Sequence, residues 1–164
     1  MPDGAVSCKL PVAGQWIEAL ASMPVIEKYS GKVIGTVPVA DREVVERAVA
    51  GAREAFDTYR AMPAHRRASI LARAVQILDR RKDELAELIC REAGKAWKYS
   101  VGEVSRAMET FQFSAEEARR IHGETVPMDA SPTGEGRLGF YLRTPVGVVA
   151  AITPFNFPLN LVAH

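Results

Sequence analysis

The sequence predicts an α/β fold that is rich in helices, and three observations support that class. Between residues 41 and 121, apolar side chains recur at helical spacing over long stretches. Residues 138–142 alternate between apolar and other side chains, which is typical of a half-buried strand. Residues 146–152 form a continuous apolar run rich in β-branched side chains, which favours a strand covered on both faces. The helices need one another or a sheet to cover their apolar stripes.

Length and composition are those of a soluble globular protein. The 164 residues allow one domain with a real core. A hydrophobic content of 48% and a charged content of 25% are ordinary, and a net charge of +1 gives no electrostatic reason to expect nucleic acid or an anionic membrane. The start of the chain lacks the apolar region of a signal peptide, and no apolar run approaches membrane-spanning length.

Short strands and then three helices are expected up to residue 123. Residues 16–17 and 33–37 predict strands, with a turn at residues 30–32 between extended pieces. The first helix follows Asp41, a residue suited to an N-cap, and ends before Pro63. The second runs from there to Gly94 and the third spans about residues 97–121. The second helix carries a predicted buried stripe of Ile70, Leu71, Ala74, Ile77 and Leu78, continued by Leu85, Leu88 and Ile89. Its basic residues are interleaved with acidic ones, which favours a solvated face over nucleic-acid binding.

A two-stranded ribbon is expected over residues 124–142, with a turn at residues 129–136 that is rich in serine, proline and glycine. Such a ribbon alone is marginal in water, so we expect it to pair with another edge. Gly134, Gly136 and Gly139 satisfy the G-x-G-x-x-G pattern of dinucleotide-binding loops. Here that pattern runs from a turn into a strand instead of opening a helix, so a ribbon turn is the better interpretation.

The cysteines and histidines do not form a recognisable reactive or metal-binding pattern. Cys90 lies within the second predicted helix, where a structural thiol is the favoured interpretation, and Cys8 lies in the N-terminal arm. The absence of C-x-x-C spacing favours a reducing, cytoplasmic setting. His65, His122 and His164 are far apart in sequence, so a metal site is not expected.

The last stretch of the chain predicts a strand, a tight loop and a helix start. Pro154 stops the apolar run of residues 146–152, because proline cannot donate to a sheet ladder. Pro158 suits the first turn of a helix, which we expect over residues 159–164. Ligands of open α/β sheets bind beyond the carboxyl ends of strands, and Asn156 lies at that place. An asparagine in this position is also an ordinary helix cap.

The segment I-T-P-F-N-F-P-L-N-L at residues 152–161 resembles the signature that follows the first nucleotide-binding strand of the aldehyde dehydrogenase superfamily. Residues 92–95 resemble the E-x-G-K turn of the same family. The likeness covers almost the whole chain, which corresponds to roughly the first third of such an enzyme. It implies the N-terminal part of that fold, with a ribbon and the first strand of a Rossmann-like sheet. It also implies three parts. Residues 1–122 form an N-terminal arm and the helical part of the cofactor-binding domain, residues 123–144 form the ribbon of the oligomerisation region, and residues 145–164 form the first nucleotide-binding strand and the start of the following helix.

The resemblance assigns chemistry to the loop. In the enzymes that this segment resembles, the asparagine matching Asn156 donates its side-chain N–H to the aldehyde oxygen, which becomes an oxyanion when a catalytic cysteine adds to the carbonyl. A neutral amide suits that role, because it stabilises developing negative charge without exchanging a proton. The resemblance also implies that Ile152, Thr153, Pro154 and Phe155 lie against the nicotinamide end of NAD or NADP. Phe155 stands where many relatives carry tryptophan.

Four further residues are implied to contact substrate. Phe157, Asn160 and His164 share one face of the starting helix by their spacing, and that face lines the substrate tunnel in relatives. Ordinary core packing is the alternative for these three. Arg106 lies in V-G-E-V-S-R, near an arginine that relatives use to bind small anionic aldehydes, and an arginine on an outer helix face is the alternative.

The resemblance therefore implies the N-terminal portion of a cytoplasmic NAD(P)-dependent aldehyde dehydrogenase, which oxidises an aldehyde to a carboxylic acid through a cysteine thiohemiacetal. It points to the branch acting on lactaldehyde, glyceraldehyde 3-phosphate or phosphonoacetaldehyde. The expected partners are a small-molecule aldehyde and further copies of the protein bound through the ribbon, with no nucleic acid, membrane or metal. The catalytic cysteine and glutamate have no counterpart here, so we expect the chain to be inactive alone. The alternative is a non-catalytic truncated product that self-associates through the ribbon and the apolar strand.

Overall fold

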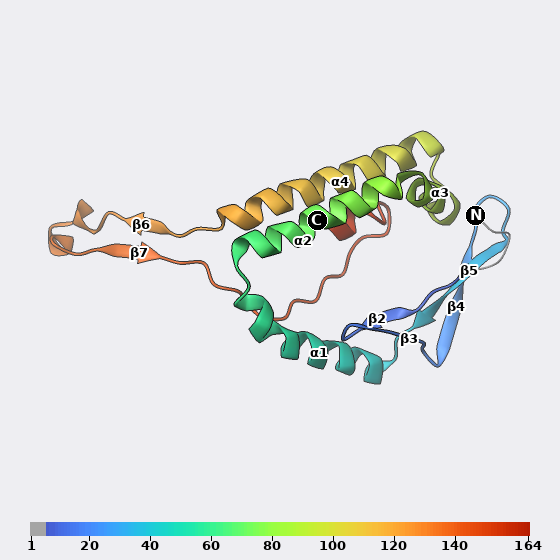
Figure 1. Cartoon of the computed structure of the whole chain (residues 1–164), viewed down its shortest axis with the longest axis horizontal. Coiled ribbons are helices and arrows are strands. Elements are labelled where there is room, and N and C mark those ends of the chain that lie inside the picture. Colours follow the sequence, from blue (N-terminus) through green and yellow to red (C-terminus); the bar gives the residue numbers. More distant parts are fainter. Residues whose placement is uncertain (1–5) are drawn as a thin grey trace.

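The computed structural model describes residues 6–164 and shows an elongated arrangement (Figure 1). A layer of helices occupies the middle, small sheets of N-terminal strands lie at one end, and a thin two-stranded ribbon projects from the other end. The first five residues of the predicted N-terminal arm lie outside the described residues. The α/β class predicted from the sequence is confirmed. Within residues 6–164, none of the helices is long and apolar enough to cross a bilayer.

Five short strands form the N-terminal end. They are β1 (Val6–Ser7), β2 (Leu10–Val12), β3 (Gln15–Ile17), β4 (Ala21–Ile26) and β5 (Val33–Val39). Strand β5 lies between β1, which is parallel to it, and β4, which is antiparallel, while β2 and β3 form a separate hairpin. The predicted strands at residues 16–17 and 33–37 are confirmed. Strands β1, β2 and β4 were not predicted, since pieces of two to six residues offer little periodicity to recognise.

Four helices follow: α1 (Arg42–Arg60), α2 (Ala64–Arg80), α3 (Lys82–Ala93) and α4 (Trp97–Arg120). The Asp41 side chain accepts a hydrogen bond from the N–H of Val44 at 2.9 Å, which confirms the predicted N-cap. The prediction of one continuous helix from Pro63 to Gly94 is wrong. The backbone leaves helical geometry at Arg81, with φ of −109° and ψ of 16°, and α3 takes a new direction from there.

Arg81 also forms an ion pair across this break. Its guanidinium donates to both carboxylate oxygens of Glu84, at 2.6 and 2.8 Å. The hydrogen bond from Arg81 lowers the pKa of the Glu84 carboxyl below its ordinary value. The pair is exposed, so it stabilises the junction between the helices only weakly.

The small core lies where α4 packs against α2 and α3. Val104 is fully buried with Ala86 and Ile89, and alanines along the same face let the helices approach closely. The predicted buried stripe of the second helix is only partly correct, because Ile70, Ile77 and Leu88 are exposed. Helix α1 buries none of its residues.

The predicted ribbon is confirmed. Strands β6 (Glu124–Val126) and β7 (Gly139–Tyr141) pair antiparallel, joined by 3₁₀ turns η1 (Met128–Ala130) and η2 (Pro132–Gly134). A Cβ at Gly134 would lie 1.7 Å from the Met128 carbonyl oxygen, so glycine is needed for a close turn and not for a phosphate. The ribbon's apolar side chains at Leu138, Phe140 and Leu142 are exposed, contrary to the half-buried strand predicted there.

The strand predicted at residues 146–152 does not form. These residues take no regular structure and, within residues 6–164, they pair with no other strand. A strand forms only where a neighbour supplies hydrogen-bond partners, and here Val146, Val149 and Ile152 are exposed instead. The predicted helix start is confirmed as the short α5 (Asn160–Ala163).

We predict that Val104→Ala lowers the free energy of unfolding by about 2 kcal/mol, because it removes two buried methyl groups from the centre of the core. Val45→Ala provides a matched control, since Val45 is 51% exposed on α1. Urea denaturation of the chain measures both. Equal effects of the two substitutions would contradict the assignment of the core to α4.

Candidate functional site

The candidate site is the loop of residues 153–159, which connects the apolar run of residues 146–152 to α5. Asn156 and Phe155 are exposed, and Phe157 is half-buried. Ile152, Thr153 and Pro154 are exposed as well. The assignment of these residues to oxyanion and nicotinamide binding stays a prediction. What the structure adds is the way in which the far end of the loop is fastened to α4.

A buried carboxylate on α4 fastens the loop. Glu103 is only 2% exposed, and its Oε1 accepts hydrogen bonds from the backbone N–H of Leu159 at 2.9 Å and of Asn160 at 3.3 Å. Its Oε2 forms an ion pair with Lys95. Gly94 ends α3 in the left-handed conformation, with φ of 69°, and this turn leads the chain from α3 to Lys95.

Asn160 and His164 face α4, in agreement with the helical spacing that placed them on one side. The Thr110 hydroxyl donates to Oδ1 of Asn160 at 3.1 Å and lies 3.5 Å from Nε2 of His164. Asn160 is 3% exposed, so in this structure it packs as part of the interior. Contact of Asn160 and His164 with substrate stays a prediction.

Phe157 and Arg106 lie together at a cavity of about 510 Å³ that Lys95 and Lys98 also line. The Arg106 guanidinium lies 5.6 Å from the centre of the Phe157 ring, and Nζ of Lys95 lies 3.7 Å from it. Glu103 neutralises Lys95, whereas Lys98 and Arg106 take part in none of the ion pairs found within residues 6–164. The cavity therefore presents a cation beside an aromatic wall, which suits a small anion.

Glu103 and Lys95 are the residues whose role was missed from the sequence. Glu103 stands among Ser100, Val104 and Ala107 at helical spacing, on the buried face of α4. A lone carboxylate on such a face predicts a buried ion pair or hydrogen bond, because a buried charge requires a partner. The E-x-G-K turn at residues 92–95 was recognised only as a likeness, and its lysine proves to be that partner.

Cys90 sits in a structural setting. Its thiol donates to the carbonyl oxygen of Lys95 at 2.8 Å and accepts from the hydroxyl of Ser100 at 3.7 Å. These contacts join the end of α3 to the start of α4, as expected for a structural thiol. Among residues 6–164, no cluster of three or more histidine, cysteine or acidic side chains is arranged to hold a metal ion.

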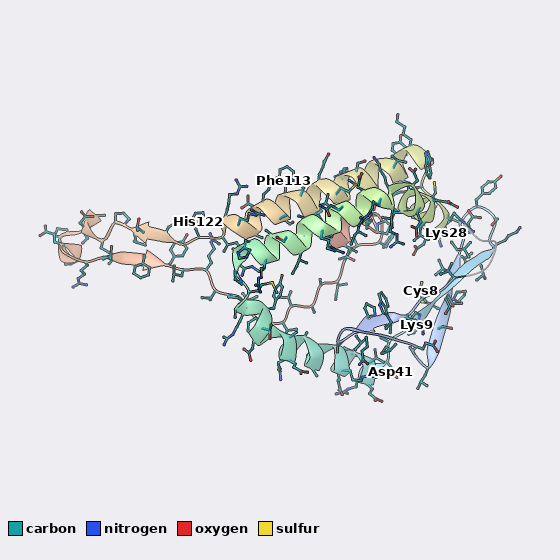
Figure 2. All side chains as sticks on the ribbon, viewed as in Figure 1. Cys8, Lys9, Lys28, Asp41, Phe113 and His122 are labelled. Atoms are coloured by element: carbon teal, nitrogen blue, oxygen red, sulfur yellow. The ribbon has the colours of Figure 1, made fainter. Side chains whose placement is uncertain are left out.

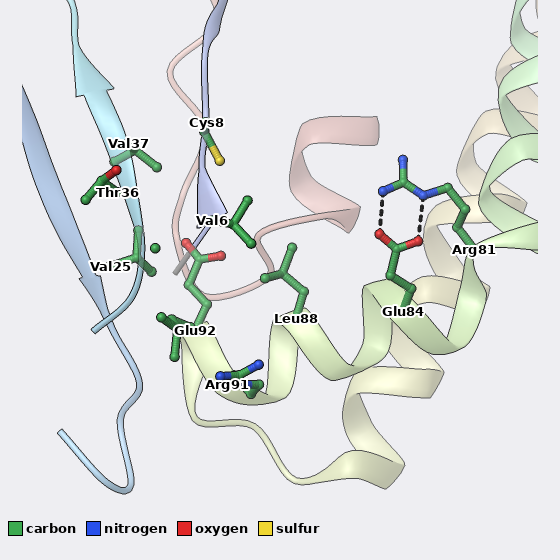
Figure 3. Close-up of a pocket in the computed structure, with 12 residues that line it drawn as sticks. Val6, Cys8, Val25, Thr36, Val37, Arg81, Glu84, Leu88, Arg91 and Glu92 are labelled. Atoms are coloured by element: carbon green, nitrogen blue, oxygen red, sulfur yellow. Dashed lines mark hydrogen bonds and ion pairs between the residues drawn. The ribbon is translucent and has the colours of Figure 1, made fainter. Parts of the chain in front are cut away.

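A second cavity, of about 310 Å³, lies between the N-terminal strands and α3 (Figure 3). Val6, Val25 and Leu88 form apolar walls, and Cys8 faces the space from the strand side. The N–H of Lys28 donates to the carbonyl oxygen of Arg91 at 3.3 Å, which ties the sheet to α3 nearby. None of the predicted site residues lines this cavity.

Comparisons with known proteins agree on one family. A model described as "Aldehyde dehydrogenase family" matches residues 16–164. The 3-sulfolactaldehyde dehydrogenase of Priestia aryabhattai is 44% identical over 155 residues, which are 94% of this chain and 32% of that protein. The malonate-semialdehyde dehydrogenase of Bacillus pumilus is 42% identical, over 90% of this chain and 30% of that protein. This chain thus spans about a third of the length of the curated relatives that it matches.

Solved structures show the same likeness. Aldehyde dehydrogenase 21 from Physcomitrella patens, in complex with the reaction product succinate, superposes with a TM-score of 0.92 at 35% identity, over 98% of this chain and 34% of that one. The NADP-dependent glyceraldehyde-3-phosphate dehydrogenase from Bacillus halodurans, complexed with NADP, gives 0.90 at 34% identity, over 96% and 34%. The predicted fold, the N-terminal part of an aldehyde dehydrogenase, is confirmed.

We predict that a maleimide labels Cys8 at least about tenfold faster than Cys90, because Cys8 is exposed and the Cys90 thiol is hydrogen-bonded and partly buried. Mass spectrometry of the labelled chain measures both rates. Cys8→Ser is the control and should leave only the slow reaction. Equal rates in the native chain would show that Cys90 is not held as described.

Proposed function

This chain belongs to the aldehyde dehydrogenase family, and we propose that it supplies the oxyanion-binding loop of an NAD(P)-dependent enzyme that oxidises an aldehyde to a carboxylic acid. The observation that carries the proposal is the loop of residues 153–159, fastened to α4 beside a cationic cavity. In this assignment the chain holds the substrate oxygen and one side of the cofactor. The relatives' remaining length would supply the other reacting groups.

Asn156 is the catalytic residue of the proposal. Its amide N–H donates to the aldehyde oxygen as that oxygen gains negative charge. The donor matters most when the charge has developed, so it stabilises the transition state more than the bound aldehyde. Asn156 is exposed and lies next to Phe157, which lines the cationic cavity, so the amide and the cavity can serve one substrate.

NAD(P), which accepts hydride when bound, fits the residues proposed to hold it. Residues 153–155 are exposed, with Phe155 at 90%, so a flat ring can lie against them without displacing a packed contact. The relatives include structures described as NADP-dependent and NAD-dependent enzymes.

A small anionic aldehyde is the proposed substrate class, with Arg106 as its charge partner. The names of the relatives denote sulfolactaldehyde, malonate-semialdehyde and aspartate-semialdehyde dehydrogenases, whose aldehydes also carry a sulfonate or carboxylate. Arg106 offers a guanidinium beside Phe157, the residue that follows Asn156, at the cavity that both Arg106 and Phe157 line. Lys95 is the weaker choice, because Glu103 already neutralises it.

The ribbon of β6 and β7 is proposed to bind further copies of the protein in the cytoplasm. Val126, Leu138, Phe140 and Leu142 expose apolar side chains along it. An apolar two-stranded ribbon gains stability by adding to another edge. The alternative, a non-catalytic product that self-associates, rests on the same exposed surface. The two proposals differ because only the enzyme requires the Asn156 side chain for its activity.

In the complete enzyme, Asn156→Ala should lower kcat by about 10²–10³-fold, since it removes an oxyanion donor. Affinity for NAD(P), measured by fluorescence titration, should change by less than about twofold, because the cofactor contacts the backbone there. Asn156→Asp keeps the size of the side chain and loses the donor, so it should be at least as slow. Unchanged turnover in both variants would remove Asn156 from the mechanism.

Arg106→Ala should raise KM for a carboxylated aldehyde by roughly tenfold or more, because it removes a charge-assisted hydrogen bond. KM for a neutral aldehyde of equal chain length should stay the same. Steady-state kinetics with both substrates measure the difference. Arg119→Ala, an exposed arginine farther along α4, is the matched control. An equal rise for both aldehydes would contradict a charge-binding role.

A further inference from the structure

We infer that Glu103 is a positioning residue for the loop that carries Asn156, with Lys95 as its required counter-ion. In this chain, Glu103 orders residues 157–160. That this order also aims the Asn156 amide rests on the proposed function.

The burial of Glu103 demands an explanation. Its side chain has no exposed surface, and it lies beside Val104 on the face of α4 that forms the core. Taking a carboxylate out of water costs several kcal/mol unless it is paired and hydrogen-bonded. Every buried side-chain nitrogen or oxygen among residues 6–164 has a partner, and Glu103 finds its own partners outside α4.

The two carboxylate oxygens of Glu103 bind different partners. Oε2 pairs with Lys95, and Oε1 accepts from two consecutive backbone N–H groups, of Leu159 and Asn160. Those N–H groups lie at the start of α5, where they have no partner within the helix. A carboxylate is the strongest acceptor a side chain can offer there. The turn into α5 is therefore fastened by a charge on α4, 56 residues away in sequence from Leu159.

Lys95 and Thr110 complete the fastening. Nζ of Lys95 lies over the ring of Phe157, the residue that directly follows Asn156, at 3.7 Å from its centre. Thr110 holds the side chain of Asn160. The loop is thus held at residues 157, 159 and 160, while residues 146–152 have no pairing within residues 6–164. In this chain the direction of Asn156 depends on contacts that lie on its C-terminal side.

Amide hydrogen exchange of this chain tests whether Glu103 orders residues 157–160. Glu103→Gln keeps the shape of the side chain and loses the charge, so the amides of Leu159 and Asn160 should exchange about tenfold faster. Amides in the middle of α4, such as that of Ala107, should keep their exchange rates. Glu109→Gln, an exposed glutamate on the same helix, is the matched control and should change none of them. Unchanged exchange at Leu159 and Asn160 in Glu103→Gln would overturn the inference.

A second variant covers the case in which Glu103→Gln unfolds the chain. Glu103→Gln leaves Lys95 without its counter-ion, and Glu103→Gln with Lys95→Met removes both charges together. The double variant should fold, keep slow exchange in α4, and still exchange faster at Leu159 and Asn160 than the native chain. Native exchange rates there in the folded double variant would mean that the carboxylate does not order the loop.

A double-mutant cycle on kcat in the complete enzyme tests whether this order aims the Asn156 amide. If Glu103 acts through Asn156, Glu103→Gln lowers kcat in the native background and has no further effect on Asn156→Ala. If the two substitutions lower kcat independently, so that their effects multiply in the double variant, Glu103 has a role apart from Asn156. That result would overturn the positioning claim. Failure of the proposed function is distinct, since Asn156→Ala would then leave kcat unchanged while the exchange result still stands.

Discussion

The ion pair between Glu103 and Lys95 is the constraint on which the candidate site depends. A carboxylate at the centre of a small core is stable only with its partners in place, so the folding of α4 and the order of the loop are linked. The linkage joins three parts of the chain: the turn after α3, the buried face of α4, and the start of α5. The loop has little sheet pairing to hold it in place, so the Glu103 carboxylate holds it instead.

The same ion pair neutralises one of the cations beside Phe157. Three basic side chains line the cavity beside Phe157. Lys95 is paired with Glu103, whereas Lys98 and Arg106 take part in none of the ion pairs found within residues 6–164. Of these two, Arg106 lies against the aromatic ring of Phe157. A guanidinium on an aromatic face is well suited to a carboxylate or sulfonate, because its fork of donors is already oriented. Under the proposed function, the Glu103–Lys95 pair leaves Arg106 as the cation that binds the anion.

Much of the apolar surface of this chain has no cover within residues 6–164. Helix α1 buries no residue, the ribbon exposes its apolar side chains, and Val146 and Ile152 are exposed in the segment before the loop. Phe113 also projects outward from α4 (Figure 2). Surfaces of this kind mark contacts with other polypeptide segments. Under the proposed function they are the faces that meet the rest of the enzyme and its further copies.

Local signals in the sequence determined the helices, the ribbon and the family. The N-cap at Asp41 and the apolar spacing along α4 predicted helices, the glycine-rich turn predicted the ribbon, and the motif around Asn156 indicated the family. The break at Arg81 and the missing strand at residues 146–152 could not be predicted, because both depend on neighbours in space. A strand requires a partner strand, however apolar its sequence. Tertiary structure alone decided that the carboxylate of Glu103 meets the backbone of α5, since a buried charge selects its partners by distance in the fold and not by distance along the chain.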